Sequence, residues 1–457
     1  MADLLSVGLD VGTTTTQLIL STLQVENKAS GFAVPNMAIT NRTVAYRSPV
    51  IFTPLKRDQL VDGDAIATWV ENQYRQAGVK REQVDTGAII ITGETSRKEN
   101  ADTVLSALSD FAGDFVVATA GPDLESVLAA KGAGAVSASL EEEWDILHMD
   151  IGGGTSNLAL IRQGKVIRTG CLNVGGRLIK FDETGRITYR SPVLEGLTDL
   201  QVGQYPAELQ IESLAKILTN ALEMAAGLRP VTDLLSHLWT KECGPVWEIP
   251  EKPPILSFSG GVADCIKTTF EGRRFGDMGP PLGQAIRQSL LCKGRYLLGQ
   301  ETIRATVIGA GCHSTQLSGS TVYCQGINLP LKNLPVVRFS YEEQAREDLP
   351  DLIQERYRRA DSTQVVLALP GYPSPTYEAV SALAKKIAAA TDGKDLYLCL
   401  ENDMAKALGH CLGLHTPAPC LCIDGLKLTE GSYLDVGTPV GPALPVVIKT
   451  LILSKEG

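Results

Sequence analysis

The sequence predicts an α/β fold with two related lobes, because one strand-and-turn pattern occurs twice. Residues 9–18 read LDVGTTTTQL, and residues 149–158 read MDIGGGTSNL. In each copy an apolar run ends in Asp, an apolar residue and Gly, and a turn rich in Gly, Thr and Ser leads into a second apolar run. A third Gly-rich strand end, SFSGGVAD, follows at residues 257–264. We therefore expect two similar halves that face each other across a shared cleft.

The first lobe is expected to span residues 1–140. Apolar runs of strand length alternate there with segments of helical periodicity, which is typical of an α/β domain. The expected elements, in order, are strands at Leu4–Leu9 and Leu18–Leu23, a β-rich stretch at Thr43–Thr53, a helix at Asp64–Gln76, strands at Ala88–Ile91 and Val116–Ala118, and a helix of small residues at Asp123–Ala135.

The second lobe, residues 141–329, repeats this order, with a polar β-rich insertion near 181–204. Its expected elements are a strand hairpin at Ile146–Arg162, a strand at Lys165–Leu172, a helix at Glu208–Ala226, a buried strand at Ile255–Phe258 and a helix from Gln284 to about Gly309.

Residues 330–457 are expected to form a smaller C-terminal α/β unit, whose last strand packs back on the body. Short apolar strands at Val365–Gly371, Leu396–Glu401, Cys420–Asp424 and Val446–Leu453 are accompanied by helical patterns at Tyr377–Ala390 and Asp403–Leu412.

Composition excludes several classes of function. A net charge of −10 gives no electrostatic reason to bind nucleic acid or an anionic membrane. No apolar run reaches the roughly 18 residues of a membrane span, and the N-terminus has no basic, apolar leader pattern.

The ten cysteines are scattered through apolar segments. Cys420 and Cys422 could form half of a metal site, but no second Cys pair lies nearby to complete four ligands. We expect a cytoplasmic protein that binds neither nucleic acid nor membranes.

The duplicated turns have the chemistry of a triphosphate site. Their backbone N–H groups and hydroxyls can bind phosphate oxygens. Asp10 and Asp150, each at the end of a strand, can hold Mg²⁺ through water. A turn carboxylate that caps its own backbone is the alternative for each Asp alone, and ordinary turn chemistry is the alternative for the hydroxyl residues. The sequence predicts that ATP and Mg²⁺ bind between the lobes, with the turn residues Gly12, Thr13, Thr14, Gly152, Gly153, Gly154 and Thr155 at the phosphates.

The third motif and two near misses complete this interpretation. Ser259, Gly260 and Gly261 follow a buried strand, and glycines without a Cβ would let an adenosine approach the backbone closely; a plain strand-to-helix turn is the alternative. No G-x4-G-K-[S/T] pattern occurs, which excludes a P-loop. The segments beginning at Gly132 and Gly309 match only part of the dinucleotide fingerprint G-x-G-x-x-G.

The three motifs, in this order, resemble the actin/Hsp70/sugar-kinase ATPase superfamily. The resemblance implies duplicated RNase-H-like lobes around a nucleotide cleft, joined by helices of small residues. In chaperone-like members a Glu at the position of Glu125 helps to orient the attacking water. A first-turn carboxylate favoured by the helix dipole is the alternative for Glu125. Glu94 competes for the same role, because its loop follows a central strand end where cleft residues gather.

Further stretches are similar to the ethanolamine ammonia-lyase reactivating factor family, over essentially the whole chain. They are TGETSRKENA (92–101), FGDMGPPLG (275–283), GAGCHSTQLSGSTV (309–322) and the ending LDVGTPV…PVVIKTLIL. This resemblance implies a chaperone-like ATPase whose partner is ethanolamine ammonia-lyase. It would promote release of damaged cobalamin from the lyase, so that adenosylcobalamin can replace it. The family's setting includes bacterial microcompartments, and a homo-oligomer remains open.

Two rival functions stay open on the same fold. A small-molecule kinase would need a base for an acceptor hydroxyl, and no unambiguous candidate appears. A filament-forming scaffold of the actin kind is the other. The chain has no D-x-H-x-x-G cobalamin signature, and His410 in ALGHCLG lacks the preceding Asp. We therefore expect a protein that acts on a cofactor held by another protein, with lobe closure changing as ATP is hydrolysed.

Overall fold

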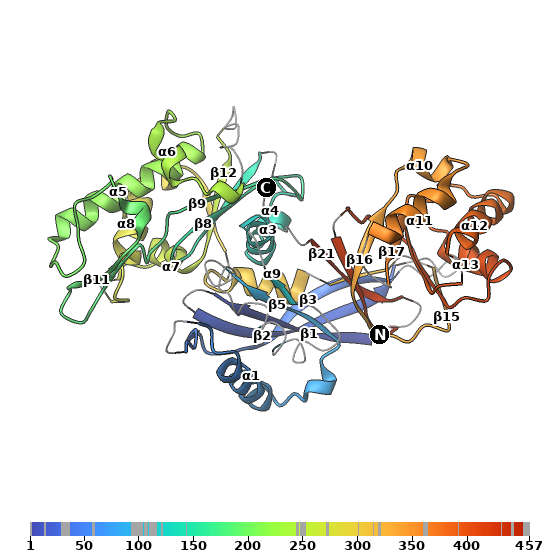
Figure 1. The fold of residues 1–457 in the computed structure, drawn as a ribbon. Coiled ribbons are helices and arrows are strands. Elements are labelled where there is room, and N and C mark those ends of the chain that lie inside the picture. Colours follow the sequence, from blue (N-terminus) through green and yellow to red (C-terminus); the bar gives the residue numbers. More distant parts are fainter. Residues whose placement is uncertain are drawn as a thin grey trace.

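The 457-residue chain forms three large sheets and one small two-stranded sheet, with associated helices (Figure 1). The structure is a computed structural model, and it describes residues 2–12, 15–28, 37–56, 60–92, 104, 108, 117–119, 122–142, 144–243, 246, 253–270, 274–299, 301–313, 315–318, 321–359, 364–391, 393–430, 432–439 and 443–450.

The sheet of the first lobe has the order β3-β2-β1-β5-β6, and β4 pairs with β2. Antiparallel pairing joins β1 to β2 and β2 to β3, whereas β5 and β6 continue parallel to β1. Helix α1 begins after Asp62, whose carboxylate accepts a hydrogen bond from Ala65 N at 3.1 Å, and it ends at Gly78 with φ +70°. The elements are β1 Ala2–Val11, β2 Thr15–Asn27, β3 Met37–Arg47, β4 Ile51–Phe52, α1 Gly63–Ala77, η1 Arg81–Gln83, β5 Thr86–Ile91 and β6 Val117–Thr119.

The sheet of the second lobe repeats the topology of the five strands β1, β2, β3, β5 and β6, and β4 has no counterpart in it. Its order is β9-β8-β7-β12-β13, with β7, β8 and β9 antiparallel and with β12 and β13 parallel to β7. The strands are β7 Ile146–Ile151, β8 Ser156–Arg162, β9 Lys165–Leu172, β12 Ile255–Ser259 and β13 Tyr296–Leu298. Three antiparallel strands followed by two parallel ones, present twice, confirm the predicted α/β fold of duplicated RNase-H-like lobes.

Two helices of small residues lie between these sheets (Figure 1). Helix α3, Pro122–Gly132, packs on the second sheet, and α9, Ala305–His313, packs on the first. The helices cross in near backbone contact. A Cβ on Gly132 would lie 1.9 Å from Ala305 O, and a Cβ on Gly309 would lie 2.0 Å from Leu128 O. Only glycine allows this approach, so the pair ties the two lobes together.

The remaining elements of the second lobe surround its sheet. The polar segment near 181–204 contains the small sheet of β10 and β11. The predicted helix from Gln284 to Gly309 is wrong: α8, η5, strand β13 and α9 occupy that stretch, because Gly294 and Gly299 interrupt it and β13 pairs with β12. The elements are α4 Ala135–Ala138, β10 Ile179–Phe181, β11 Ile187–Arg190, η3 Pro192–Leu194, α5 Glu208–Ala225, α6 Asp233–Leu238, η4 Lys241–Cys243, α7 Gly261–Lys267, α8 Gly279–Gln288 and η5 Leu290–Cys292.

The third sheet has eight strands in the order β14-β21-β20-β16-β17-β18-β19-β15. We call this sheet and its helices, within residues 315–450, the C-terminal unit. It begins before residue 330, and its last strand, β21, pairs with β20 and β14. The elements are β14 Thr315–Leu317, β15 Val322–Gln325, β16 Leu331–Arg338, α10 Tyr341–Ala345, α11 Leu349–Arg359, β17 Val366–Leu369, α12 Tyr377–Thr391, β18 Leu396–Leu400, α13 Ala405–Gly413, β19 Cys420–Ile423, β20 Ser432–Val436 and β21 Pro445–Thr450.

Alternation along the parallel strands β16 to β19 separates the two faces of this sheet. Val337, Leu367 and Leu398 point to the face that α11, α12 and α13 cover. Their neighbours Val336 and Val366 pack on the opposite face, against residues such as those after β19. Parallel strands wound in sequence order place their crossover helices on one face, which explains this arrangement.

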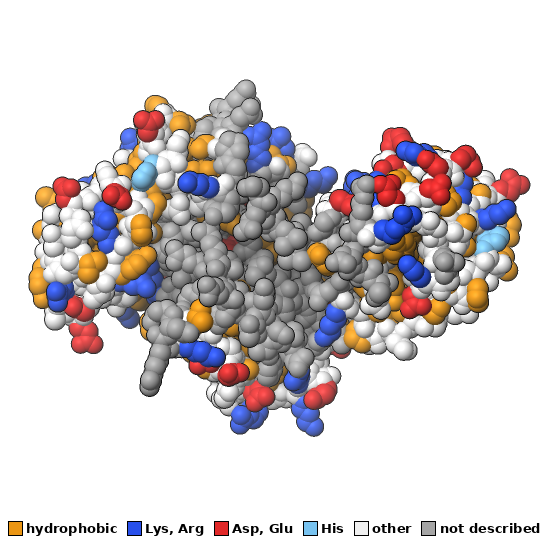
Figure 2. All heavy atoms as spheres, viewed as in Figure 1, with side chains coloured by type: hydrophobic (Ala, Val, Ile, Leu, Met, Phe, Trp, Pro, Cys, Tyr) orange, Lys and Arg blue, Asp and Glu red, His pale blue; other side chains and the backbone are white. Residues whose placement is uncertain are grey.

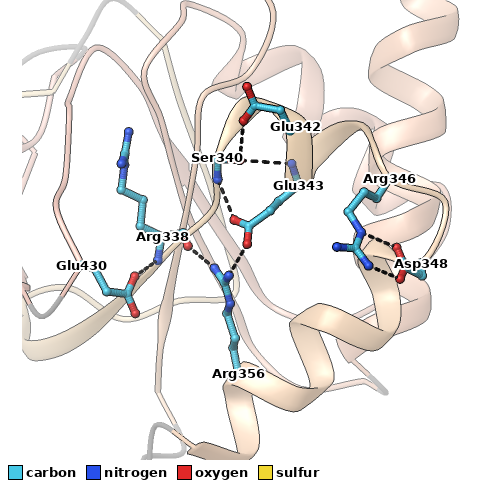
Figure 3. A network of polar contacts seen from close by, with 8 residues as sticks. All are labelled: Arg338, Ser340, Glu342, Glu343, Arg346, Asp348, Arg356 and Glu430. Atoms are coloured by element: carbon cyan, nitrogen blue, oxygen red, sulfur yellow. Dashed lines mark hydrogen bonds and ion pairs between the residues drawn. The ribbon is translucent and has the colours of Figure 1, made fainter.

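A polar network fixes α10 and α11 to the end of β16 (Figure 3). Ser340 caps α10: its Oγ accepts from Glu343 N at 3.2 Å, and Glu343 Oε2 accepts from Ser340 N at 2.8 Å. Arg356 of α11 donates to Glu343 and to the carbonyl of Arg338, and its guanidinium lies 4.7 Å from the ring centre of Phe339. The charges satisfy one another, so we interpret the network as structural.

Acidic and basic side chains are interspersed over the visible face of the C-terminal unit (Figure 2). Within the described ranges, no helix has the length and the apolar character needed to span a bilayer.

Candidate functional site

A cavity of about 560 Å³ lies between the two lobes, and residues from both line it. The predicted site residues that it brings together are Asp10, Gly12, Glu125, Asp150, Gly152, Gly153, Gly154, Thr155, Gly260 and Gly261. Three others, Thr13, Thr14 and Glu94, lie outside the described residues. Ser259 is fully buried directly beneath the cavity, where it contacts Asp150.

The two duplicated turns close in the same way. Gly12 N donates to Thr15 O at 2.9 Å, and Gly152 N donates to Thr155 O at 2.9 Å. Each turn joins the first two strands of its sheet, so that Asp10 pairs with Gln17 and Asp150 with Asn157 in the strand register. Equivalent turns in equivalent sheets therefore present the two aspartates to one cavity.

Asp10 is almost fully buried at the first turn. Its Oδ1 accepts from Thr92 Oγ1 at 2.9 Å, and its Oδ2 accepts from Gln17 Nε2 at 3.4 Å. Burial raises the pKa of Asp10 from 3.8 to about 6, and the negative charge of Asp150 adds to the rise. The carboxylate is thus poorly compensated by its own neighbours.

Asp150 has the corresponding place in the second lobe. It accepts hydrogen bonds from Ser259 Oγ and, at 3.5 Å, from Thr306 Oγ1 of α9. Beneath it, His148 contacts Ser259 Oγ through Nε2 at 2.9 Å and Ser257 Oγ through Nδ1 at 3.0 Å. Burial raises the pKa of Asp150 from 3.8 to about 6 and lowers the pKa of His148 to about 3.

These two carboxylates fit the requirements of Mg²⁺ bound with a polyphosphate. Among the described residues, neither Asp10 nor Asp150 pairs with a lysine or arginine. A hard divalent cation would offset both buried charges, and Mg²⁺ usually binds through one or two carboxylates, water and substrate phosphates. The pair supplies that set of ligands without a closed protein cage.

Glu125 lies in the first turn of α3 and lines the same cavity. Only 7% of its surface is exposed, and its Oε2 accepts a hydrogen bond from Asn157 Nδ2 at 2.8 Å. Glu125 thus presents a buried carboxylate to the cavity that the two turns also line.

Two aromatic residues and an arginine also line the cavity. Phe270 and Phe275 meet edge to face with their ring centres 5.1 Å apart. Arg177 lines the cavity and forms an ion pair with Asp277 at 3.1 Å. Its guanidinium also lies 5.7 Å from the ring centre of Phe52 in the first lobe, so it contacts both sides of the cleft.

Gly260 is required by the backbone at the third motif. It has φ +86°, and a Cβ there would lie 2.3 Å from Ile151 O in the neighbouring strand. We expect Gly260→Ala to destabilise the protein by about 2 kcal/mol or more and to weaken nucleotide binding, because strand β7 must shift. Gly261→Ala is the matched control, since a Cβ there meets nothing within 4 Å. Urea denaturation of both variants checks this, and equal stabilities would contradict it.

Several cavity residues were missed from the sequence. Thr92 and Thr306 reach the aspartates only through the fold, and no local pattern marks them. Gln17 and Asn157 could have been found, because each lies seven residues after the Asp of its repeat and both carry a carboxamide. The pattern His-x-Asp at 148–150 and Ser-x-Ser at 257–259 also places these side chains on one face of adjacent strands.

Comparison with known proteins decides the family. The family of the ethanolamine utilisation protein EutA matches residues 2–454. The chain belongs to this family. It is 37% identical to the ethanolamine ammonia-lyase reactivase EutA of Salmonella typhimurium strain LT2, and the comparison covers 98% of each chain. The identity with the protein of the same name from Escherichia coli strain K12 is also 37%, again over 98% of each chain.

Among solved structures, a PPX-GPPA enzyme of Aquifex aeolicus is similar to part of the chain. The comparison covers 67% of this chain and 99% of that enzyme, with a TM-score of 0.43 and 12% identity. The fold assignment therefore rests on the duplicated strand topology, and the family assignment rests on the sequence. The resemblance to the reactivating factor family, inferred from the motifs, is confirmed.

Proposed function

We propose that this chain is an ATPase that reactivates ethanolamine ammonia-lyase. The observation that carries the proposal is the convergence of two matched turns, each with a buried aspartate, on one cavity between the lobes. The name of the relatives, ethanolamine ammonia-lyase reactivase, supplies the partner.

In this proposal the two turns bind the phosphates of ATP from opposite lobes. Backbone N–H groups of the glycine-rich second turn suit phosphate oxygens, because Gly154 leaves open space around its Cα. Asp10 and Asp150 would hold Mg²⁺, which would neutralise charge on the phosphates. Gly260 and Gly261 would border the nucleoside.

Hydrolysis adds a water oxygen to the terminal phosphorus, breaks the bond from that phosphorus to the bridging oxygen, and yields ADP and phosphate. In this proposal Glu125 accepts a proton from that water. The carboxylate is buried and lies on the helix that crosses α9, so it also connects the site to the crossing helices. Glu94 remains the alternative proposal for this role.

Closure of the lobes would couple this reaction to the partner. Nucleotide can shift the complex only through different affinities for the two conformations. We propose that the ATP-bound and ADP-bound forms bind the lyase with different affinities. This difference would allow damaged cobalamin to leave and adenosylcobalamin to replace it. A first lobe at 1–140, a second lobe that begins at 141, a cytoplasmic location and an association with a microcompartment are parts of the same proposal.

The decisive experiment combines inactivated lyase with this protein, adenosylcobalamin and Mg-ATP. We expect deamination to return with ATP and not with a non-hydrolysable analogue, with phosphate released in step. Recovery with the analogue would contradict coupling to hydrolysis. Transfer of phosphate to a small acceptor such as ethanolamine would instead support the kinase alternative.

A further inference from the structure

A row of buried hydrogen bonds in the second lobe ends at the Asp150 carboxylate. Ser257 Oγ lies 3.0 Å from His148 Nδ1, and His148 Nε2 lies 2.9 Å from Ser259 Oγ. Ser259 Oγ in turn donates to Asp150 Oδ1. We call the side chains of Ser257, His148 and Ser259 the polar row. No member of it is more than 1% exposed.

The matching positions of the first lobe are apolar. There β5 pairs with β1, so that Gly8 lies opposite Ala88 and Asp10 lies opposite Ile90. The histidine and the two serines occupy the corresponding places in the second lobe, because β12 pairs with β7 in the same way. Ala88 and Ile90 pack in an apolar cluster with Ala310 of α9. The fold can therefore fill these positions without polar groups.

Keeping three polar side chains in such a place indicates a task for them. Burial of a hydroxyl or an imidazole costs free energy unless every group finds a partner. In the polar row each member has one, and the row ends at a carboxylate that lines the cavity between the lobes. Asp150 is thus the point at which the polar row can affect a ligand.

The direction of these hydrogen bonds follows from the charge on Asp150. An ionised carboxylate can only accept, so the single hydrogen of Ser259 is donated to Asp150. The fully buried imidazole of His148 is neutral, because burial disfavours its charged form. Since Ser259 Oγ has to accept from this ring, its one proton lies on Nε2, and Nδ1 accepts from Ser257. Every hydrogen of the polar row then points toward Asp150, and such chains strengthen each bond.

We propose that His148 is a positioning residue for the metal: it directs the hydroxyl of Ser259 onto Asp150 and so fixes the orientation of that carboxylate. Ser259 occupies Asp150 Oδ1. Among the described residues, Asp150 Oδ2 accepts only a long hydrogen bond, from Thr306 Oγ1 at 3.5 Å, and it keeps capacity for Mg²⁺ or for a water bound to it. A carboxylate held in this way binds a cation more tightly than a free one. This inference rests on the proposed Mg-ATP site.

Nitrogen-15 spectra of the metal-free protein at pH 8 test the direction of the polar row without relying on turnover. The ring shifts of a histidine distinguish a proton on Nε2 from a proton on Nδ1. Loss of one signal set in His148→Gln assigns His148 among the five histidines. We expect the Nε2-protonated form in wild type. A proton on Nδ1, or a mixture of both forms, overturns the inference.

The Mg²⁺ concentration that half-saturates ADP binding tests the effect on the metal. His148→Phe keeps an aromatic ring but cannot donate to Ser259, so this concentration should rise roughly 10- to 100-fold, whereas ADP affinity in EDTA should stay within about threefold. His148→Gln restores a donor and should recover most of the loss. Ser257→Ala copies Ala88 of the first lobe and should act in the same direction by a smaller factor. If His148→Phe does not fold, Ser257→Ala carries the same test.

Controls separate positioning from a general packing defect. His148→Phe added to Ser259→Ala should change the Mg²⁺ requirement by less than about twofold, because His148 acts through Ser259. Ser318→Ala removes a buried hydroxyl that accepts from Leu444 N at 2.9 Å in the C-terminal unit, and it should leave the requirement unchanged.

An unchanged Mg²⁺ requirement in folded His148→Phe, or fully additive effects of His148→Phe and Ser259→Ala, overturns the inference and leaves the proposed metal site standing. If Mg²⁺ does not strengthen ADP binding to wild type, the proposed metal site itself fails, and the inference fails with it.

Discussion

Replacing Asp150 by Asn is expected to reduce phosphate release from ATP by about 100-fold or more and to abolish rescue of the lyase. The substitution keeps the shape of the side chain and its contact with Ser259 but removes the charge that Mg²⁺ would bind. Asp10→Asn should behave in the same way, because Asp10 has the equivalent place in the first lobe. Phosphate release and recovered deamination are the measurements.

Asp145→Asn is the matched control, since Asp145 pairs with Arg162 at 2.7 Å near the start of β7, outside the lining of the cavity. It should retain both activities. Normal activity in both Asp10→Asn and Asp150→Asn would remove the assignment of the site.

Asp150→Asn should also stabilise the metal-free protein at alkaline pH. The folded state raises the pKa of Asp150 from 3.8 to about 6, so it binds the proton more tightly than the unfolded chain does. The stability that this contributes is complete below about pH 4 and is lost as the pH rises through about 6. The variant should gain on the order of 2–3 kcal/mol over wild type at pH 8 and nothing at pH 4. Urea denaturation in the presence of EDTA measures this, and equal stability at pH 8 would contradict it.

Glu125→Gln is expected to bind Mg-ATP normally and to hydrolyse it about 100- to 1,000-fold more slowly. The amide keeps the volume of the side chain but cannot accept the proton of the attacking water. Glu125 is buried, lines the cavity and accepts a hydrogen bond from Asn157, which supports the proposal for this residue.

Glu94→Gln, made in parallel, decides between the two carboxylates. Equilibrium binding of a fluorescent ATP analogue and single-turnover hydrolysis should be measured on both variants. Slow hydrolysis in Glu94→Gln with normal hydrolysis in Glu125→Gln would reverse the assignment. Slow hydrolysis in both would mean that the two residues share the task.

The duplicated lobes could be predicted because their signal is local and repeated. Each aspartate comes after a buried strand and before a tight turn, so sequence order alone places it at a sheet edge. The sequence also predicts a shared cavity, because two equivalent turns can bind one ligand only if they face each other. The strand pairing in the structure agrees with this repeat, because Asp10 and Asp150 have equivalent positions in the registers of their two sheets.

Other features depend on tertiary contacts that a single segment does not encode. The sequence predicts that residues 296–298 belong to a helix. They form β13 instead, because they pair in parallel with the edge of β12. The strand β16, Leu331–Arg338, contains Pro335 and polar residues, which obscure its alternation. Thr92 and Thr306 meet the aspartates from loops and helices distant in the sequence. Sequence order alone gave no reason to select them.

Helix α9 has a consequence for how the C-terminal unit is attached. Its first turn reaches Asp150 through Thr306, and its last turn is held to the first lobe by Arg42, which donates to Cys312 O at 2.7 Å. Directly after it, β14 enters the third sheet by pairing with β21. The nine-residue helix is about 13 Å long, with its first turn at the cleft and its last turn next to the first strand of the third sheet. A change in the tilt of α9 would therefore change the orientation of the third sheet, and the displacement would grow with distance from the helix.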